Sequence, residues 1–125
     1  MKKRYILLIL VLVVGVLAIY LQNKIDKEAE AVAIEEIHPD KLKDGSYTGE
    51  YSVGPVTVQS RTTIQDGKIT EINILKHANG LGGKAETIVE DVIDKQSLSV
   101  DSIAGATVSS KVILKSIEQA LKQAK

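Results

Sequence analysis

The sequence predicts an α+β fold, in which two amphipathic helices pack on a small antiparallel sheet and one N-terminal transmembrane helix precedes them. Three observations support this prediction. The stretch of residues 5–21 carries no charge, three later stretches alternate apolar and polar residues across tight turns, and from Ala85 onward the apolar residues recur with a helical period.

The uncharged stretch YILLILVLVVGVLAIYL, residues 5–21, is the predicted transmembrane anchor. As a helix it would span about 25 Å, near the lower limit for crossing a bilayer. The basic tip, residues 1–4, predicts a cytoplasmic N-terminus and an exported remainder. A cleaved signal peptide is the alternative, but the stretch ends in Ile-Tyr-Leu-Gln-Asn, a poor cleavage site, so the sequence favours an uncleaved anchor.

Residues 22–44 are predicted to form an acidic stalk. Their Glu, Lys and Ala content suits a short exposed helix, and His38-Pro39 marks its end because the residue before a proline is disfavoured in helices. The turn pair Asp44-Gly45 predicts that the folded domain occupies residues 45–125. A domain of this size has a marginal core, so a bound ligand would add noticeably to its stability.

The domain opens with three stretches typical of strands. Alternation runs over residues 46–53, 55–64 and 68–75, with a slip of register near Thr70–Glu71, and Asp66-Gly67 is a hairpin signal. These stretches predict an antiparallel meander. After a glycine-rich loop at residues 76–84, two helical stripes follow: Ala85, Ile88, Val89, Val92 and Ile93, then Val112, Ile113, Ile117, Ala120 and Leu121.

Composition excludes several classes of function. The absence of cysteine excludes disulfides, thiolate metal sites and iron–sulfur clusters, and two histidines in separate segments make a metal site improbable. Sixteen basic and sixteen acidic residues, with no basic stripe, give no support for nucleic-acid binding. No nucleophile–His–acid set is detectable from spacing, so no catalytic residue is predicted. An electron-transfer function would therefore need an organic cofactor.

The stretch DSIAGATVSS, residues 101–110, carries the strongest functional signal. Gly105 and Ala106 have almost no side chain, so backbone can approach a ligand closely there. Thr107 falls at the predicted start of the last helix, where free N–H groups and the helix dipole favour a phosphate. The alternative is that Thr107, Ser109 or Ser110 simply caps that helix. The local pattern alone favours the cap.

This stretch resembles the covalent flavin-attachment motif of the FMN-binding domain family, in which Asp, two variable residues and Ser or Thr precede Gly-Ala-Thr. Here the motif reads Asp101-Ser102-Ile103-Ala104-Gly105-Ala106-Thr107, followed by Val108-Ser109-Ser110. The resemblance implies that Thr107 forms a phosphoester with FMN, installed by an exported flavin transferase that reads a pattern containing Asp101. Ala104 departs from the family pattern, which removes a possible hydrogen bond near the phosphate.

The resemblance extends from about residue 44 to the final helix and includes the glycine-rich loop. His77 would lie near the flavin or its phosphate, with a solvated loop histidine as the alternative. Gly80 and Gly82 would let backbone approach the flavin ring, or would serve only as loop glycines. The cofactor-binding residues implied are Thr107, Asp101, Ala104, Gly105, Ala106, Val108, Ser109, His77, Gly80 and Gly82.

Together these observations predict a single-pass membrane flavoprotein whose extracytoplasmic domain relays electrons through FMN on Thr107. We expect a carrier rather than an enzyme with its own substrate. Its partners would be the flavin transferase and membrane or extracellular redox partners. Two alternatives stay open at this point: an exported non-redox binding module, and a domain that binds FMN without a covalent bond.

Overall fold

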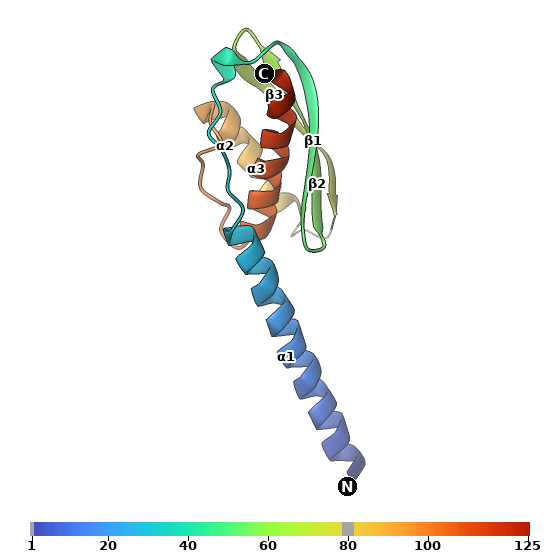
Figure 1. Cartoon of the computed structure of the whole chain (residues 1–125). Helices are drawn as coiled ribbons and strands as arrows, with labels where there is room; N and C mark the ends of the chain where they lie inside the picture. Colours follow the sequence, from blue (N-terminus) through green and yellow to red (C-terminus); the bar gives the residue numbers. More distant parts are fainter. Residues whose placement is uncertain (1, 79–81) are drawn as a thin grey trace.

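The computed structural model describes residues 2–78 and 82–125 as a long helix leading into a two-layer α+β domain (Figure 1). The helix α1 spans Lys2–Glu30, and a 3-10 turn η1 at Pro39–Lys41 precedes the sheet. The strands are β1 (Gly45–Val53), β2 (Val56–Gln65) and β3 (Lys68–Ala78), paired antiparallel in the order β1-β2-β3. The predicted meander is confirmed.

Two tight turns fix the register of this meander. Gly54 (φ 55°) begins the β1–β2 turn, and Asp66 (φ 52°) and Gly67 (φ 75°) form the β2–β3 turn. In the β2–β3 turn both central residues, Asp66 and Gly67, have positive φ, which is the turn geometry that matches the right-handed twist of a hairpin. The ladder pairs Thr63 with Glu71 and then Ile64 with Ile69. The skipped Thr70 is a bulge, at the place where the alternation predicted a slip of register.

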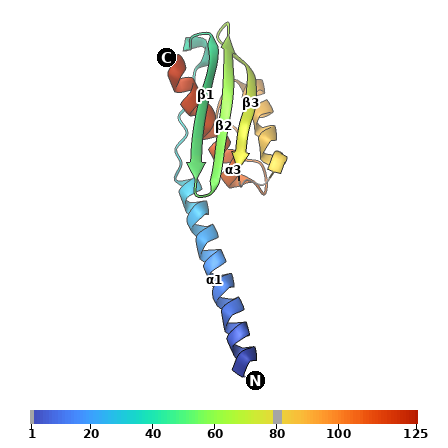
Figure 2. The ribbon, with the colours of Figure 1, turned by 90° about the vertical axis from the view of Figure 1, so that its right-hand side faces the viewer.

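The helices follow the sheet in the chain and cover one of its faces (Figures 1 and 2). They are the 3-10 helix η2 (Gly82–Thr87), α2 (Ile88–Lys95), α3 (Thr107–Leu121) and the terminal 3-10 turn η3 (Lys122–Ala124). Along β2, Val58 and Ile64 are buried toward the helices, whereas Arg61 and Gln65 on the other face are exposed. This alternation is what a sheet covered on one side requires.

Small residues let α3 lie very close to the sheet. A Cβ at Gly49 of β1 would overlap the carbonyl oxygen of Ser116 and the backbone nitrogen of Ala120. The fully buried hydroxyls of Ser60 and Ser116 form a hydrogen bond of 2.7 Å with each other across the same contact. Buried polar groups are tolerated when they are paired in this way.

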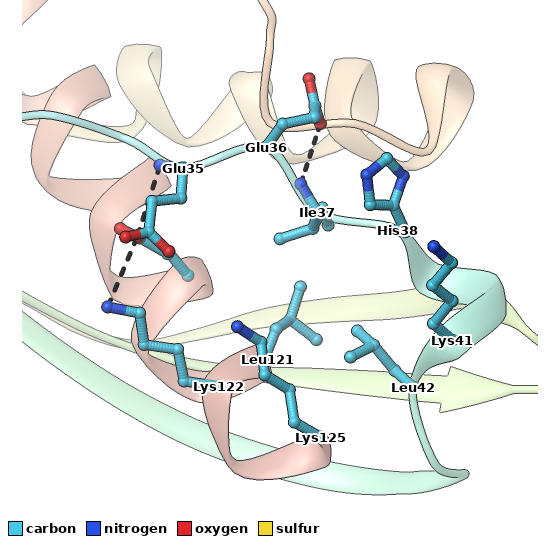
Figure 3. Close-up of a pocket in the computed structure, with 10 residues that line it drawn as sticks. Glu35, Glu36, Ile37, His38, Lys41, Leu42, Leu121, Lys122 and Lys125 are labelled. Atoms are coloured by element: carbon cyan, nitrogen blue, oxygen red, sulfur yellow. Dashed lines mark hydrogen bonds and ion pairs between the residues drawn. The ribbon is translucent and has the colours of Figure 1, made fainter.

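The segment of residues 32–42, here called the strap, lies against the helical layer and differs from the exposed stalk that composition suggested. Its partly buried apolar side chains, Val32, Ile34, Ile37 and Leu42, pack against the core. The Lys115 ammonium donates to the carbonyl of Ala33 at 2.8 Å. The backbone N–H of Glu35 donates to the buried carboxylate of Glu118 at 3.3 Å (Figure 3).

The strap covers the side of α3 that the sheet leaves open. Sequence predicted an amphipathic helix, but α3 lies between the sheet and the strap, and ten of its residues are buried. Glu118, only 1% exposed, is held by the ammonium of Lys115 at 2.6 Å and by that of Lys122 at 3.7 Å. A buried carboxylate needs such partners, because an unpaired buried charge is strongly destabilising.

The helix α1 is continuous from the apolar stretch into the domain. Its apolar part is exposed throughout, whereas Ala29 in its last turn is 1% exposed and belongs to the core. Ile25 contacts the β1–β2 turn: its Cγ1 lies 3.1 Å from the position that a Cβ would take on Gly54. Mean hydropathy reaches 2.7 along α1, so this helix could be a membrane anchor or a signal sequence.

Candidate functional site

The loop before α3 is organised by Ser110. Its hydroxyl donates to the carbonyl of Ala106 at 2.7 Å and accepts the backbone N–H of Ile103 at 2.9 Å. The Ala106 N–H donates to the Ile103 carbonyl at 2.9 Å, so the chain turns tightly before the helix. Gly105 has φ 77° in this turn, a conformation that favours glycine.

Thr107 is the first residue of α3 and does not cap the helix. The N-cap position belongs to Ala106, which has no hydroxyl, and no side-chain cap hydrogen bond is made there. Ser109 and Ser110 lie inside the helix, so neither takes that position. Thr107 is exposed, and within the described part of the chain its hydroxyl has no hydrogen-bond partner. The simple capping interpretation therefore does not explain Thr107.

The start of α3 is suited to an anion. The N–H groups of Thr107, Val108 and Ser109 have no acceptor within the helix, because the first N–H groups of a helix lack one. Lys84 of η2 adds positive charge close to this turn. Its Nζ lies 3.4 Å from the position that a Cβ would take on Gly105. No described carboxylate forms an ion pair with Lys84. Free N–H groups, a helix dipole and an ammonium together favour a phosphate.

His77 joins the end of the sheet to the same helix start. It lies on β3, which extends three residues beyond the predicted strand, through Lys76–Ala78. Its Nε2 is 3.2 Å from the hydroxyl of Ser109, and its Nδ1 is 3.7 Å from Oε2 of Glu86. The His77 side chain is only 7% exposed, so it is not a solvated loop histidine.

The Ser109–His77–Glu86 arrangement resembles a nucleophile–base–acid set in its order of groups. Ser109 is 2% exposed, and its hydroxyl contacts the imidazole of His77. A nucleophile must reach the reacting atom of its substrate, and a buried hydroxyl does not. We therefore assign His77 a structural contact beside the Thr107 loop.

The remaining predicted residues take different positions around Thr107. Asp101, Ala104 and Gly105 are exposed on the loop, Ala106 is buried, and Val108 is half-buried. Gly82 begins η2, the short helix that carries Lys84. Gly80 lies outside the described residues. The loop and the start of α3 thus bring together all of the predicted motif, and His77 adjoins it through Ser109.

Two cavities lie at opposite ends of α3. One, of about 220 Å³, is lined by Thr107 and Val108 together with Asp26, Ala29 and Glu30 of α1. The other, of about 250 Å³, lies between the strap and the C-terminal end of α3, and its lining includes Leu42, Leu121, Lys122 and Lys125 (Figure 3). Only the first adjoins the predicted attachment residue.

Metal binding has no support in this region. Within residues 2–78 and 82–125, no three His, Asp or Glu side chains gather as a metal ion would require. The site is therefore characterised by a hydroxyl, free backbone N–H groups and one ammonium, which is the chemistry of phosphate binding.

Fold and site together define a small α+β domain that presents an exposed threonine at a phosphate-compatible helix start, next to a long apolar helix. The chain matches the FMN-binding domain family over residues 54–122, more than half of its length, and it belongs to that family. The matched range contains β2, β3, both main helices of the domain and Thr107.

Two relatives extend the similarity. The chain is 34% identical over 110 residues to the NADH:acrylate oxidoreductase of Vibrio harveyi, a match that covers 78% of this chain and 10% of that protein. It is 26% identical over 88 residues to an uncharacterized protein of Treponema pallidum (strain Nichols), covering 68% of this chain and 24% of that protein. The chain thus spans about a tenth and about a quarter of these relatives.

The residues fit the cofactor that the family implies. The Thr107 hydroxyl is exposed and unused in capping, the neighbouring N–H groups have no acceptor within the helix, and Lys84 supplies a positive charge. Sequence reasoning missed Lys84 and Glu86. A lysine closing a glycine-rich loop is a signal that could have identified Lys84, whereas nothing local connects Glu86 with His77.

Proposed function

We propose that this protein is a membrane-anchored, extracytoplasmic electron carrier that holds FMN through a phosphoester on Thr107. The observation that carries the proposal is the exposed Thr107 hydroxyl at a helix start where Ala106, and no hydroxyl, occupies the cap position. Membership of the FMN-binding domain family supplies the cofactor. FMN, when bound, supplies redox chemistry in one- or two-electron steps.

The chain's own residues would hold and orient the phosphate. The free N–H groups of α3 would donate to its oxygens, and the Lys84 ammonium would offset its negative charge. Gly105 and Ala106 would leave room beside it, since neither carries a bulky side chain. His77 would fix the side chain of Ser109, two residues from the attachment point.

Covalent attachment suits an exported protein. A cofactor that dissociates outside the cell is lost by dilution, whereas an ester retains it. The partner that this proposal requires is a flavin transferase, for which Asp101 and the exposed loop up to Thr107 would be the accessible recognition segment. The other partners would be redox proteins or carriers that exchange electrons with the flavin.

A carrier is a better description than an enzyme with its own substrate. The Vibrio relative is named an oxidoreductase, but the match covers only a tenth of that protein. In the described part of this chain we find no accessible nucleophile–base pair and no metal cluster. The domain would therefore supply a positioned flavin, and other proteins would supply the donors and acceptors.

The test is production of the full chain in cells that contain a flavin transferase. After denaturation, the peptide that contains Thr107 should carry the mass of an added FMN and should fluoresce in a gel. Thr107→Ala should abolish the adduct, whereas Ser102→Ala, which removes a neighbouring hydroxyl from the same loop, should keep it. Thr107→Ser should retain some attachment because the hydroxyl remains.

The alternative outcomes identify the competing functions. If the flavin is released on denaturation, it is bound without a covalent bond, and the proposed ester on Thr107 is wrong. A colourless protein of unmodified mass, made beside an active transferase, would refute the carrier and leave an exported binding module.

A further inference from the structure

The cavity beside Thr107 has one wall on α1 and one on α3. Its lining consists of Asp26, Ala29 and Glu30 from the last two turns of α1, and of Thr107 and Val108 from the first turn of α3. Ala29 belongs to the core, so this end of α1 is fixed to the domain. Figures 1 and 2 show that the end of α1 and the start of α3 lie at the same end of the domain. The attachment residue therefore shares a cavity with the helix that precedes the domain.

The α1 wall of this cavity carries two carboxylates. Asp26 and Glu30 are four residues apart, so they lie on the same face of the helix. Asp26 is half-buried and its Oδ1 accepts the side-chain amide of Gln22 at 3.0 Å, whereas no described residue donates a hydrogen bond to Glu30. Within residues 2–78 and 82–125, neither carboxylate forms an ion pair. Most of the acceptor capacity of the two carboxylates is therefore unused by the protein.

Acids beside a phosphate site need an explanation. Both carboxylates would repel a phosphate on Thr107, and the dipole of α3 and the charge of Lys84 would have to offset that repulsion. The part of FMN that follows the phosphate has a different character, because the ribityl chain is uncharged and carries three hydroxyl groups. Hydroxyl groups donate to carboxylates in short, charge-assisted hydrogen bonds. The two carboxylates are therefore suited to the ribityl chain.

The volume of the cavity fits the same part of the cofactor. An apolar cavity of about 150 Å³ accepts benzene, so the volume of about 220 Å³ beside Thr107 suits about eight or nine non-hydrogen atoms. The ribityl chain, with five carbons and three hydroxyl groups, matches this size, whereas the three-ring flavin system is about twice as large. The ribityl chain would fill the cavity, and the rings would extend beyond it.

We propose that Asp26 and Glu30 accept hydrogen bonds from the ribityl hydroxyls of the flavin, so that the last turns of α1 form one wall of the cofactor site. This inference rests on the proposed function and adds two binding residues to it. The family match begins at residue 54 and contains neither carboxylate. The helix α1 is then a part of the flavin site as well as the connection to the membrane.

The sign of a substitution distinguishes this role from simple repulsion. If the carboxylates accept the ribityl hydroxyls, then Asp26→Ala and Glu30→Ala weaken flavin binding. If they only repel the phosphate, the same substitutions strengthen the binding of FMN and leave that of riboflavin, which has no phosphate, unchanged. Asp26→Asn keeps a carbonyl acceptor and should bind riboflavin with an affinity between those of the wild type and Asp26→Ala.

The measurement uses the full chain without attached flavin, in detergent micelles, and records the amide NMR shifts that each probe causes. Riboflavin should shift the amides of residues 26–30 and of Thr107. Lumiflavin, which has a methyl group in place of the ribityl chain, should leave the amides of residues 26–30 unshifted. Asp26→Ala and Glu30→Ala should each raise the Kd of riboflavin about three- to tenfold, the range expected when one hydrogen bond at a partly exposed site is lost.

Glu28→Ala is the matched control. Glu28 is exposed on the same turn of α1 but lines a different cavity, beside Tyr51 and Lys115. Its removal takes away one negative charge at a similar position along the helix, so any general effect of charge would appear here too. The Kd of riboflavin should change by less than about 1.5-fold in this variant.

The outcomes separate the two proposals. Riboflavin that shifts no amide of α1, or lumiflavin that shifts these amides equally, overturns the ribityl site even if the adduct on Thr107 forms. Tighter binding of FMN by Asp26→Ala and Glu30→Ala assigns the carboxylates to repulsion and overturns it as well. A chain that binds riboflavin as expected but never acquires covalent FMN beside an active transferase refutes the ester on Thr107, while the ribityl site stands.

Discussion

Lys84 is the single residue that adds most to the site beyond what the sequence motif contains. It lies in η2, and its ammonium adjoins Gly105 in the loop before α3. The motif itself could be identified from sequence because its residues are consecutive. Lys84 lies more than twenty positions earlier in the chain, and only the fold brings it beside the loop.

We expect Lys84→Ala to slow flavin attachment two- to fivefold, because an exposed charge contributes up to about 1 kcal/mol to a nearby interaction. Lys84→Arg should keep most of the rate. Lys95→Ala, which removes an exposed lysine from the end of α2, is the matched control and should have no effect. The measurement is a time course of adduct formation by mass spectrometry, and equal rates for all three variants would exclude Lys84 from the site.

Glu36 of the strap is a second residue whose role only the structure shows. Its carboxylate accepts the hydroxyl of Ser99 at 2.6 Å and that of Ser97 at 2.9 Å, and the N–H of Ile37 at 3.0 Å. These hydrogen bonds, that from Ser99 above all, hold the pKa of Glu36 below its ordinary value of 4.5 and outweigh the opposing effect of burial. The strap is thereby joined to the link after α2.

This lowered pKa gives the stability a defined pH dependence. The folded protein binds the Glu36 proton less tightly than the unfolded chain, so the contribution is present above pH 4.5 and is lost as the pH falls through the lowered folded pKa. Glu36→Gln should therefore destabilise the protein near neutral pH and make little difference in acid. The measurement is the difference in unfolding free energy between the wild type and Glu36→Gln, obtained by urea unfolding across about pH 3–7, with Glu50→Gln as the control. A difference that stays constant with pH would contradict this assignment.

At the scale of elements, the strands and helices follow from local patterns, and their close packing follows from small residues. Alternation predicted the meander, and even the bulge at Thr70, because a strand covered on one side must keep its apolar residues on that side. The end of β3 was missed because Lys76 and His77 do not continue the alternation. The contact between β1 and α3 at Gly49 had no local signal.

Gly49→Ala should be among the most destabilising single-methyl additions in this protein. The new Cβ would overlap backbone atoms of Ser116 and Ala120, which cannot move without displacing α3 from the sheet. We expect a loss of about 3 kcal/mol in the free energy of unfolding, the upper end of the usual cost of overpacking. The control is Gly83→Ala, whose Cβ would lie 3.8 Å from its nearest neighbour, Oε2 of Glu86, and should change stability by about 0.5 kcal/mol or less.

Denaturant unfolding of both variants measures the difference. If Gly49→Ala unfolds at the same urea concentration as the control, then α3 can shift away from β1 at little cost, and the close approach is not required for stability.

At the scale of the whole molecule, the strap is the feature that sequence reasoning could not predict. Its apolar residues Val32, Ile34, Ile37 and Leu42 occur among acids and lysines with neither a strand nor a helix period, so composition suggested an exposed segment. Their partner is α3, about eighty positions later in the chain. The helical period of α3 does not reveal that the strap covers it, and the strap has no periodic pattern of its own.

A chain that begins at Gly45 should therefore be much less stable than one that begins at Ala31, because both lack the end of α1 and they differ mainly by the strap. Removal of the strap uncovers one side of α3 and leaves the buried carboxylate of Glu118 without the N–H of Glu35. Four half-buried aliphatic side chains at about 1 to 1.5 kcal/mol each predict a loss of about 4 to 6 kcal/mol. This is a large part of the stability of a small domain.

Urea unfolding of the two truncated chains, compared at the same protein concentration, measures this loss. Coincident unfolding curves would show that residues 45–125 form the complete folding unit and that the strap adds nothing to it.

The unbroken junction between α1 and the core has a kinetic consequence. For an anchored chain, the last turns of α1 pack on the core, so the domain drifts in the membrane together with its helix. Its encounters with any partner embedded in the same membrane then become a two-dimensional search, governed by the fluidity of the membrane and the surface density of both molecules rather than by their concentration in the surrounding water.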